Sequence, residues 1–324
     1  MKKSIMKVQI GISSSDSDER LMFIKQMGVN YVFCNFADED SDYNGIMRLR
    51  ERLEKFGLVL TDGSNTHIYK NASFHLGLPD CDKHISRYNE LTRDLGKAGV
   101  GINFMTWEPN NVLTSRVAVG EHTRGAEGRI VDIGQLKTLD YSHGRQFSEK
   151  EIWDNFKYFL EKALPVCEEA GVKIALHPCD PPVPELRGIH SLIHCSDDYR
   201  RAFELAGDSP YLGMKFCVGC WLEGGMEFGN LFHDLEEFIG RNKVLSVHFR
   251  NVSSTNPYFE ETLLEDGYMD MFEVMKKLVA CEYAGVISVD HVPRFAKECG
   301  GRDAGFAYST GYMKALIKCA EAVL

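Results

Sequence analysis

Helix-like and strand-like segments alternate along almost the whole chain. Stretches rich in Glu, Lys, Leu and Ala repeatedly end in a glycine, and a short β-type run follows the glycine. This arrangement is typical of a helix that ends and leads directly into the next strand. The clearest examples are QMGVNYVFCNF, KFGLVLTDG, KAGVGINFM, EAGVKIALHP and EYAGVISVDHV. Together with KVQIGIS, YLGMKFCV and VLSVHFRN, they predict eight strands.

Helix-like segments fill the intervals between these runs. They span about residues 17–28, 43–56, 80–98, 148–170, 196–206, 230–240, 269–281 and 305–323. Parallel strands need crossover helices, and closure of the sheet removes both of its edges. We therefore predict an α/β fold, a single (β/α)8 TIM barrel that spans residues 1–324 as one catalytic domain. A doubly wound open sheet is the alternative.

Two polar segments interrupt the alternation. Residues 106–147 form a long insertion after the fourth strand, and residues 252–268 form a second excursion after the seventh. Both leave the end of the barrel at which active sites lie. Such loops act as lids or binding arms, but they equally often cover the barrel or join an oligomer interface. A role for these segments in a homo-oligomer interface is therefore a possible alternative.

Composition narrows the class of protein. The 324 residues are 44% hydrophobic and 26% charged, as in ordinary globular proteins. A formal net charge of −10 argues against a general affinity for nucleic-acid phosphates. We find no signal-peptide pattern, no apolar run of the roughly 18 to 20 residues that a membrane helix needs, and no disulfide-type cysteine spacing. We expect a cytoplasmic protein without nucleic-acid or membrane partners.

Residues of metal-ligand type stand at the ends of the last four predicted strands. They are His177 in KIALHP, Cys217 in MKFCV, His248 in LSVHFRN and Asp290 in ISVDHV. The carboxyl ends of barrel strands share one rim, so these side chains should converge. Each residue alone would be an ordinary buried group. Together, two imidazoles, a thiolate and a carboxylate suit a divalent transition-metal ion better than magnesium or calcium.

Two further candidates adjoin these ligands. His291 follows Asp290 and is the candidate acid/base, because imidazole exchanges protons near neutral pH, although a structural role is the alternative. Arg250 lies two residues beyond His248, so strand alternation points both side chains to one face. There the guanidinium could bind a substrate carboxylate or form an ion pair within the barrel mouth.

Six motifs follow one another in a characteristic order. They are GINFM at 101–105, ALHPCDPP at 175–182, GMKFCVG at 213–219, VHFRNV at 247–252, EDGYMDMFEVMKKL at 265–278 and VDHVP at 289–293. In this order they resemble the motifs of the mannonate dehydratases, metal-dependent sugar-acid lyases in the xylose-isomerase-like barrel group. The resemblance extends over about residues 19–317.

The resemblance implies a reaction and a cofactor. The family dehydrates D-mannonate to 2-keto-3-deoxy-D-gluconate by removing the C2 proton and the C3 hydroxyl. Its metal, manganese or ferrous iron, is held by four residues that match His177, Cys217, His248 and Asp290, the same four that the strand ends select. We therefore expect a bound Mn²⁺ or Fe²⁺ and a small sugar acid as substrate.

Other positions are candidates for contact with the substrate. Asn103 could hydrogen-bond a sugar hydroxyl or a metal-bound water, and Asp180 could orient a ligand or the substrate, or cap a loop. Arg116 resembles an arginine of the family's WTR-type segment. The family's proposed catalytic tyrosine follows a glycine, but this chain has Phe306 there, which leaves Tyr308 as the candidate catalytic tyrosine.

Two departures from the family pattern keep other functions open. Cys179 stands where the family usually has a carboxylate, and the aspartate-histidine motif reads SVDHVP in place of an RPDHG-like segment. The same ion and base could serve a sugar isomerase or epimerase, which would reprotonate an enediolate without expelling hydroxide. A non-catalytic carbohydrate-binding barrel is a lesser alternative.

Overall fold

The computed structural model describes residues 5–324. Eight parallel strands form a closed barrel in the order β1-β13-β11-β10-β7-β4-β3-β2. Their bounds are β1 Lys7–Ser13, β2 Tyr31–Asn35, β3 Val59–Ser64, β4 Ile102–Thr106, β7 Lys173–His177, β10 Leu212–Cys217, β11 Val244–Phe249 and β13 Val286–Val289. These are the eight predicted strands, so the predicted TIM barrel is confirmed.

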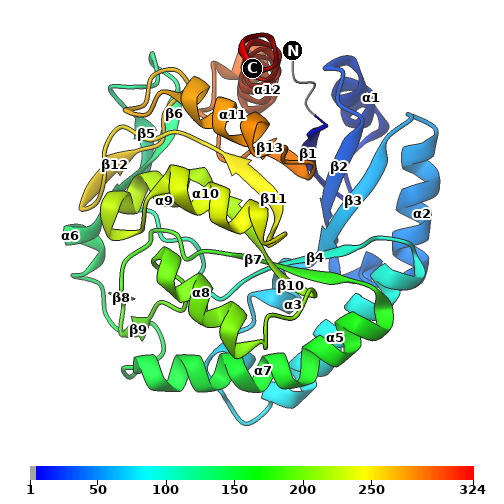
Figure 1. Cartoon of the computed structure of the whole chain (residues 1–324), viewed down its shortest axis with the longest axis vertical. Helices are drawn as coiled ribbons and strands as arrows, with labels where there is room; N and C mark the ends of the chain where they lie inside the picture. Colours follow the sequence, from blue (N-terminus) through cyan, green and yellow to red (C-terminus); the bar gives the residue numbers. More distant parts are fainter. Residues whose placement is uncertain (1–4) are drawn as a thin grey trace.

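Helices surround this barrel (Figure 1). The predicted helices are α1 Asp18–Gln26, α2 Tyr43–Glu54, α5 Cys81–Lys97, α7 Glu149–Ala170, α8 Ser196–Leu205, α10 Leu231–Gly240, α11 Met271–Ala280 and α12 Gly301–Val323. Short helices that the sequence did not predict are α3 Thr66–Tyr69, α4 Ala72–His75, α6 Ile133–Leu136 and α9 Val218–Gly224. Single turns of 3₁₀-helix are η1 Asp38–Asp40, η2 Gly225–Glu227 and η3 Lys297–Cys299.

Local capping residues set the ends of the longest helices. Ser148 and Glu151 form a reciprocal capping box that starts α7, and Gly171 ends it with φ +67°. Helix α12 begins at Gly301 and not at residue 305 as predicted, because Gly300 turns the chain with φ +101° and the helix includes the next four residues. Arg302 therefore belongs to the first turn of α12.

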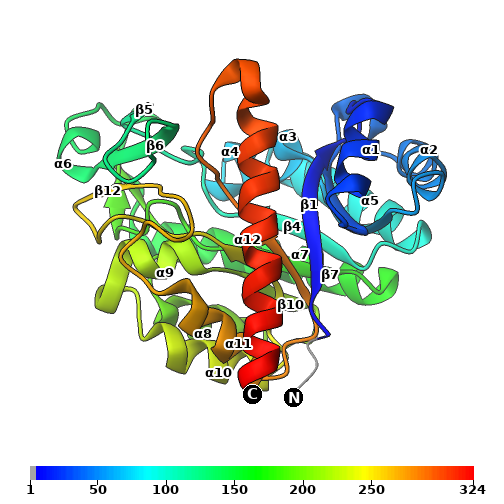
Figure 2. The same ribbon diagram turned by 90° about the horizontal axis from the view of Figure 1, so that it is seen from above.

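The two polar interruptions form one small sheet. Strands β5 Arg116–Val119 and β6 Glu127–Asp132 come from the predicted insertion, and β12 Tyr258–Glu260 comes from the second excursion. They pair antiparallel in the order β12-β6-β5. Figure 2 shows β5 and β6 at the end of the barrel toward which β1 runs, near the start of α12. A further pair, β8 Glu185–Leu186 and β9 Ile189–His190, forms a two-stranded sheet.

The barrel interior holds a buried charge pair among apolar side chains. Lys215 of β10 lies 3.9 Å from Asp62 of β3, and both side chains are 1% exposed. The ammonium also lies 4.4 Å from the ring centroids of Phe33 and Phe104. Lys215 and Cys217 share a strand face, so this cation lies inside the barrel, below the rim at which β10 ends.

Two further features of the described residues concern membrane-spanning helices and cysteines. No helix within residues 5–324 is long and apolar enough to span a bilayer. The ten cysteines all fall within this range, and none of them forms a disulfide.

Candidate metal centre and adjoining cavity

The four residues selected from the strand ends meet at the carboxyl rim of the barrel. His177, Cys217, His248 and Asp290 each offer one ligand atom, and these atoms all lie within 4.8 Å of one another. Strand register produces this convergence, since Cys217 pairs level with His248 across β10 and β11. The quartet is a group that could hold a metal ion.

The two histidines are arranged as metal-binding imidazoles usually are. Nδ1 of His177 lies 2.8 Å from the carbonyl oxygen of Pro178, and donation of its proton there leaves Nε2 free to bind an ion. His248 is buried; its Nδ1 lies 3.3 Å from a carboxylate oxygen of Asp290 without hydrogen-bond geometry, and its Nε2 has no hydrogen-bond partner within the described part of the chain. Buried polar atoms without partners are costly, so a bound ion would satisfy this ring.

The surroundings of the other two members of the quartet, Cys217 and Asp290, favour their charged forms. Burial raises the pKa of the Cys217 thiol, but Cys220 and the Arg250 guanidinium, 3.6 Å from the sulfur, outweigh burial and hold the pKa well below its usual value. Burial also opposes ionisation of Asp290, but His248 holds the pKa of that carboxyl well below its usual range. Thiolate and carboxylate are the forms that bind metals.

Arg250 lies beneath the quartet and not beside a substrate. Its side chain is 1% exposed, and Nε donates to Asp290 at 3.0 Å. The remaining nitrogens contact Glu223, Glu261, Asp180 and the Cys217 sulfur. In this structure Arg250 thus forms the ion pairs within the barrel mouth that the sequence left as the alternative to binding a substrate carboxylate.

Asp180 belongs to the same buried network. Its carboxylate accepts from Arg250 at 3.1 Å and from Arg129 at 2.6 Å, and Arg129 also donates to Glu261 at 2.9 Å. Asp180 thus orients Arg250, which contacts two members of the quartet. Asp180 therefore influences Cys217 and Asp290 indirectly, through Arg250.

His291 lies between this network and solvent. Its Nδ1 is 2.7 Å from Glu261, and its Nε2 is 3.8 Å from Asp290. The side chain is 39% exposed. Burial of part of the ring disfavours the imidazolium, but Asp290 and Glu261 outweigh it and raise the pKa of His291 to about 9. The ring is thus fixed at one nitrogen and accessible from outside.

A cavity of about 500 Å³ adjoins Asp290 and His291. Its walls come from the ends of β1, β2 and β13 and from α1 and α12. Polar groups on these walls include Ser13, Asn35, Arg20 and Arg302. The volume and the polar lining suit a small, hydroxylated ligand.

Two residues predicted to bind substrate lie elsewhere. Asn103 is buried and donates to the hydroxyl of Thr92 in α5 at 3.0 Å, so it faces the helix layer, while its neighbour Phe104 points into the barrel beside Lys215. Arg116 is exposed at the start of β5, 3.4 Å from the hydroxyl of Tyr258, and does not line the cavity. In this structure neither side chain lines the cavity beside His291.

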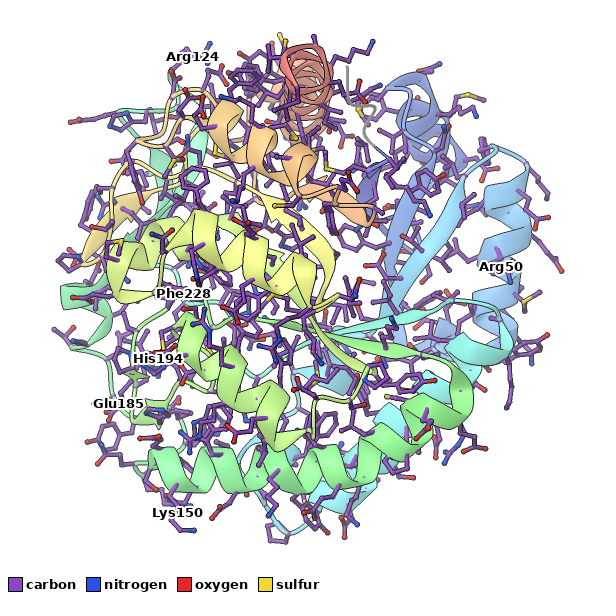
Figure 3. All side chains as sticks on the ribbon, viewed as in Figure 1. Arg50, Arg124, Lys150, Glu185, His194 and Phe228 are labelled. Atoms are coloured by element: carbon purple, nitrogen blue, oxygen red, sulfur yellow. The ribbon has the colours of Figure 1, made fainter. Side chains whose placement is uncertain are left out.

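Tyr308 also lies outside the cavity. Its hydroxyl contacts Glu265 and Arg124, and Figure 3 places Arg124 at the periphery of the molecule. Phe306 lines the cavity instead, because residues two apart on a helix point about 200° apart. In this structure the hydroxyl of Tyr308 therefore does not reach the cavity position where the family has its proposed catalytic tyrosine and this chain has Phe306.

Several residues of the site were missed from the sequence. Glu223, Glu261 and Arg129 complete the buried network, but isolated charges in loops and on short elements carry no periodic signal. Arg302 was missed because CGGRDAG reads as a loop. A glycine pair before the periodic segment was the signal that could have placed the helix start there. Cys179 was noted as a departure, and burial raises the pKa of its thiol.

Comparison with known proteins identifies the family. The family model described as D-mannonate dehydratase (UxuA) matches residues 108–323. The chain belongs to the D-mannonate dehydratase family, a family of hydro-lyases. A mannonate dehydratase of Thermotoga petrophila is 31% identical over 280 residues, which cover 76% of each chain. The resemblance read from the motifs is confirmed.

Solved structures agree on the architecture. The mannonate dehydratase from Streptococcus suis serotype 2 matches with a TM-score of 0.86 at 24% identity, over 99% of this chain and 95% of that one. A xylose isomerase domain protein from Planctomyces limnophilus matches with a TM-score of 0.67 at 12% identity, over 99% of both chains. At these identities the likeness shows a shared fold.

Proposed function

We propose that this member of the family is a metal-dependent dehydratase that converts D-mannonate to 2-keto-3-deoxy-D-gluconate and water. One observation carries the proposal: a buried set of two imidazoles, a thiolate and a carboxylate converges within 4.8 Å at the barrel rim. A polar cavity adjoins it, and it occurs in a chain of the mannonate dehydratase family.

The quartet would hold one divalent ion, Mn²⁺ or Fe²⁺. When bound, the ion supplies Lewis-acid stabilisation of the negative charge that develops as the C2 proton leaves the substrate. The protein prepares the donors in advance. Pro178 fixes the tautomer of His177, and Arg250 holds both Cys217 and Asp290 in place.

His291 is the proposed acid/base. Its side chain reaches the cavity next to Asp290, and Glu261 orients the ring through Nδ1. Because the pKa of His291 is raised to about 9, the neutral ring is the minor form near pH 7, and it is this form, with Nε2 unprotonated, that takes the C2 proton from a bound sugar acid. The C–H electron pair forms the C2–C3 double bond as the C3–O bond breaks. His291 returns a proton to the departing hydroxide, which leaves as water, and the enol product tautomerises to the 2-keto acid.

The test is turnover combined with metal analysis. The purified protein is loaded with Mn²⁺ or, anaerobically, with Fe²⁺ and incubated with D-mannonate, and 2-keto-3-deoxy acid is measured. We expect product with the wild type, and loss of both bound metal and product with His248→Ala. The matched control is His84→Ala, since His84 lies on the outer helix α5, away from the quartet's strand ends, and its Nε2 is 3.0 Å from Asp80.

Three outcomes would contradict the proposal. An epimer or ketose formed without loss of water would identify a sugar isomerase or epimerase. Stoichiometric metal without turnover of D-mannonate under either metal would overturn the dehydratase assignment. Unchanged metal content in His248→Ala would overturn the assignment of the metal ligands.

A further inference from the structure

The charged groups on the cavity wall differ in whether they have a counter-charge. Arg20 pairs with Asp303 and lies 3.7 Å from Asp16. Asp290 accepts from Arg250 at 3.0 Å, and His291 lies 2.7 Å from Glu261. Each of these lining groups is therefore already engaged by an opposite charge from the protein.

Arg302 is the exception. Within residues 5–324, no carboxylate oxygen lies within 4.0 Å of its guanidinium, although it lines the same cavity as Asp290 and His291. Partial burial and the nearby guanidinium groups of Arg294 and Arg20 lower the pKa of Arg302, and the smaller opposing effects of Asp303 and Asp16 do not cancel them. An anion in the cavity would relieve this repulsion.

The surroundings of Arg302 also orient its guanidinium. The group lies 5.1 Å from the ring centroid of Phe306, which itself is buried on the cavity wall. An aromatic ring beside a guanidinium restricts its motion and leaves its planar edge for paired hydrogen bonds. Carboxylates match that edge with two parallel acceptors.

We propose that Arg302 is the residue of this cavity that binds the carboxylate of a sugar acid, and that it makes the site select acids over uncharged sugars. The identity of the acid rests on the proposed function, whereas the unpaired cation and the cavity do not. Ser13 and Asn35, on the ends of β1 and β2, supply neutral polar groups for the hydroxyls of the same ligand.

The test measures binding separately from turnover. The probes are the 3-deoxy analogue of D-mannonate, which has no C3 hydroxyl to lose, and D-mannitol, which has no carboxylate. Both are titrated calorimetrically into the metal-loaded protein. For Arg302→Gln we expect binding of the acid to weaken by about tenfold to a hundredfold, as for loss of a charge-assisted hydrogen bond. Weak binding of D-mannitol should not change.

Two variants serve as controls. Arg294→Gln removes the same charge from a neighbouring arginine that does not line the cavity, and it should change the affinity for the acid less than twofold. Arg302→Lys keeps the charge without the planar fork and should give an intermediate affinity. Thermal unfolding and metal content should match the wild type in all three, because Arg302 and Arg294 are exposed.

Clear results would overturn the inference. Equal affinity of Arg302→Gln and wild type for the acid would do so, as would equal weakening by Arg294→Gln. Equal binding of the acid and D-mannitol by the wild type would also contradict it. If the acid binds through Arg302 but D-mannonate is not dehydrated, the proposed function fails while the carboxylate subsite stands.

Discussion

Two arginines near the barrel mouth differ in whether carboxylates of the protein surround them. Arg250 is 1% exposed, and carboxylates of Glu223, Glu261, Asp180 and Asp290 surround its guanidinium. Arg302 lies on the wall of the adjoining cavity, and within residues 5–324 no carboxylate lies within 4.0 Å of it. A guanidinium with every donor engaged holds the protein together, whereas one without a counter-charge is available to a ligand.

The comparison separates assembly of the site from recognition. Burying a charge is costly unless partners surround it, so the network around Arg250 is complete before any ligand arrives. It fixes Cys217 and Asp290 on one side and, through Glu261, His291 on the other. Arg302 on the cavity wall is exposed and has no carboxylate within 4.0 Å among residues 5–324, and the proposed partner for it is the substrate carboxylate.

The largest effect is expected from breaking the buried network. Arg250→Met would leave Glu223 and Glu261 buried with too little positive charge, so we expect about 3–5 kcal/mol less stability and loss of the metal. Urea unfolding and elemental analysis measure the two effects. The matched control is Arg124→Met, because Arg124 also contacts two carboxylates but is 56% exposed.

We expect Arg124→Met to cost at most about 1 kcal/mol, as for exposed ion pairs, and to leave metal content unchanged. If Arg250→Met unfolded like the wild type and kept its metal, the network would not be what assembles the quartet.

A smaller but specific effect is expected at the boundary between the two regions. His291→Asn should lower kcat by about 10²–10⁴-fold, the usual range for loss of a general acid/base, while the metal content and the unfolding midpoint stay close to wild type. Steady-state kinetics with elemental analysis check this. Loss of metal in proportion to activity would mean that His291 supports the ligands and does not transfer protons.

The smallest effect is expected from Tyr308→Phe. The hydroxyl contacts Glu265 and Arg124 outside the cavity, so its removal should change kcat and KM for D-mannonate less than twofold and cost about 1 kcal/mol of stability or less. A fall in kcat of tenfold or more would show that this hydroxyl reaches the substrate, and the distinction drawn between Phe306 and Tyr308 would then be wrong.

The sequence by itself determined the barrel and the quartet. Eight repeats of helix, glycine and strand predict parallel strands whose ends share a rim, and local propensity and capping decide each repeat. His177, Cys217, His248 and Asp290 could be selected because each one ends such a run. Position along a strand is a local property, so a local pattern predicts it.

Only the tertiary structure decided what each side chain meets. Alternation put Arg250 on the same face as His248, but the carboxylates that enclose it come from distant segments, which no period in the sequence connects. The pairing of β12 with β6 across the two polar segments was likewise invisible. The position of Arg302 without a carboxylate neighbour depends on where α12 begins after Gly300 and on how the helix packs. Charge pairing depends on distance in the folded protein, and the order of residues in the sequence does not give that distance.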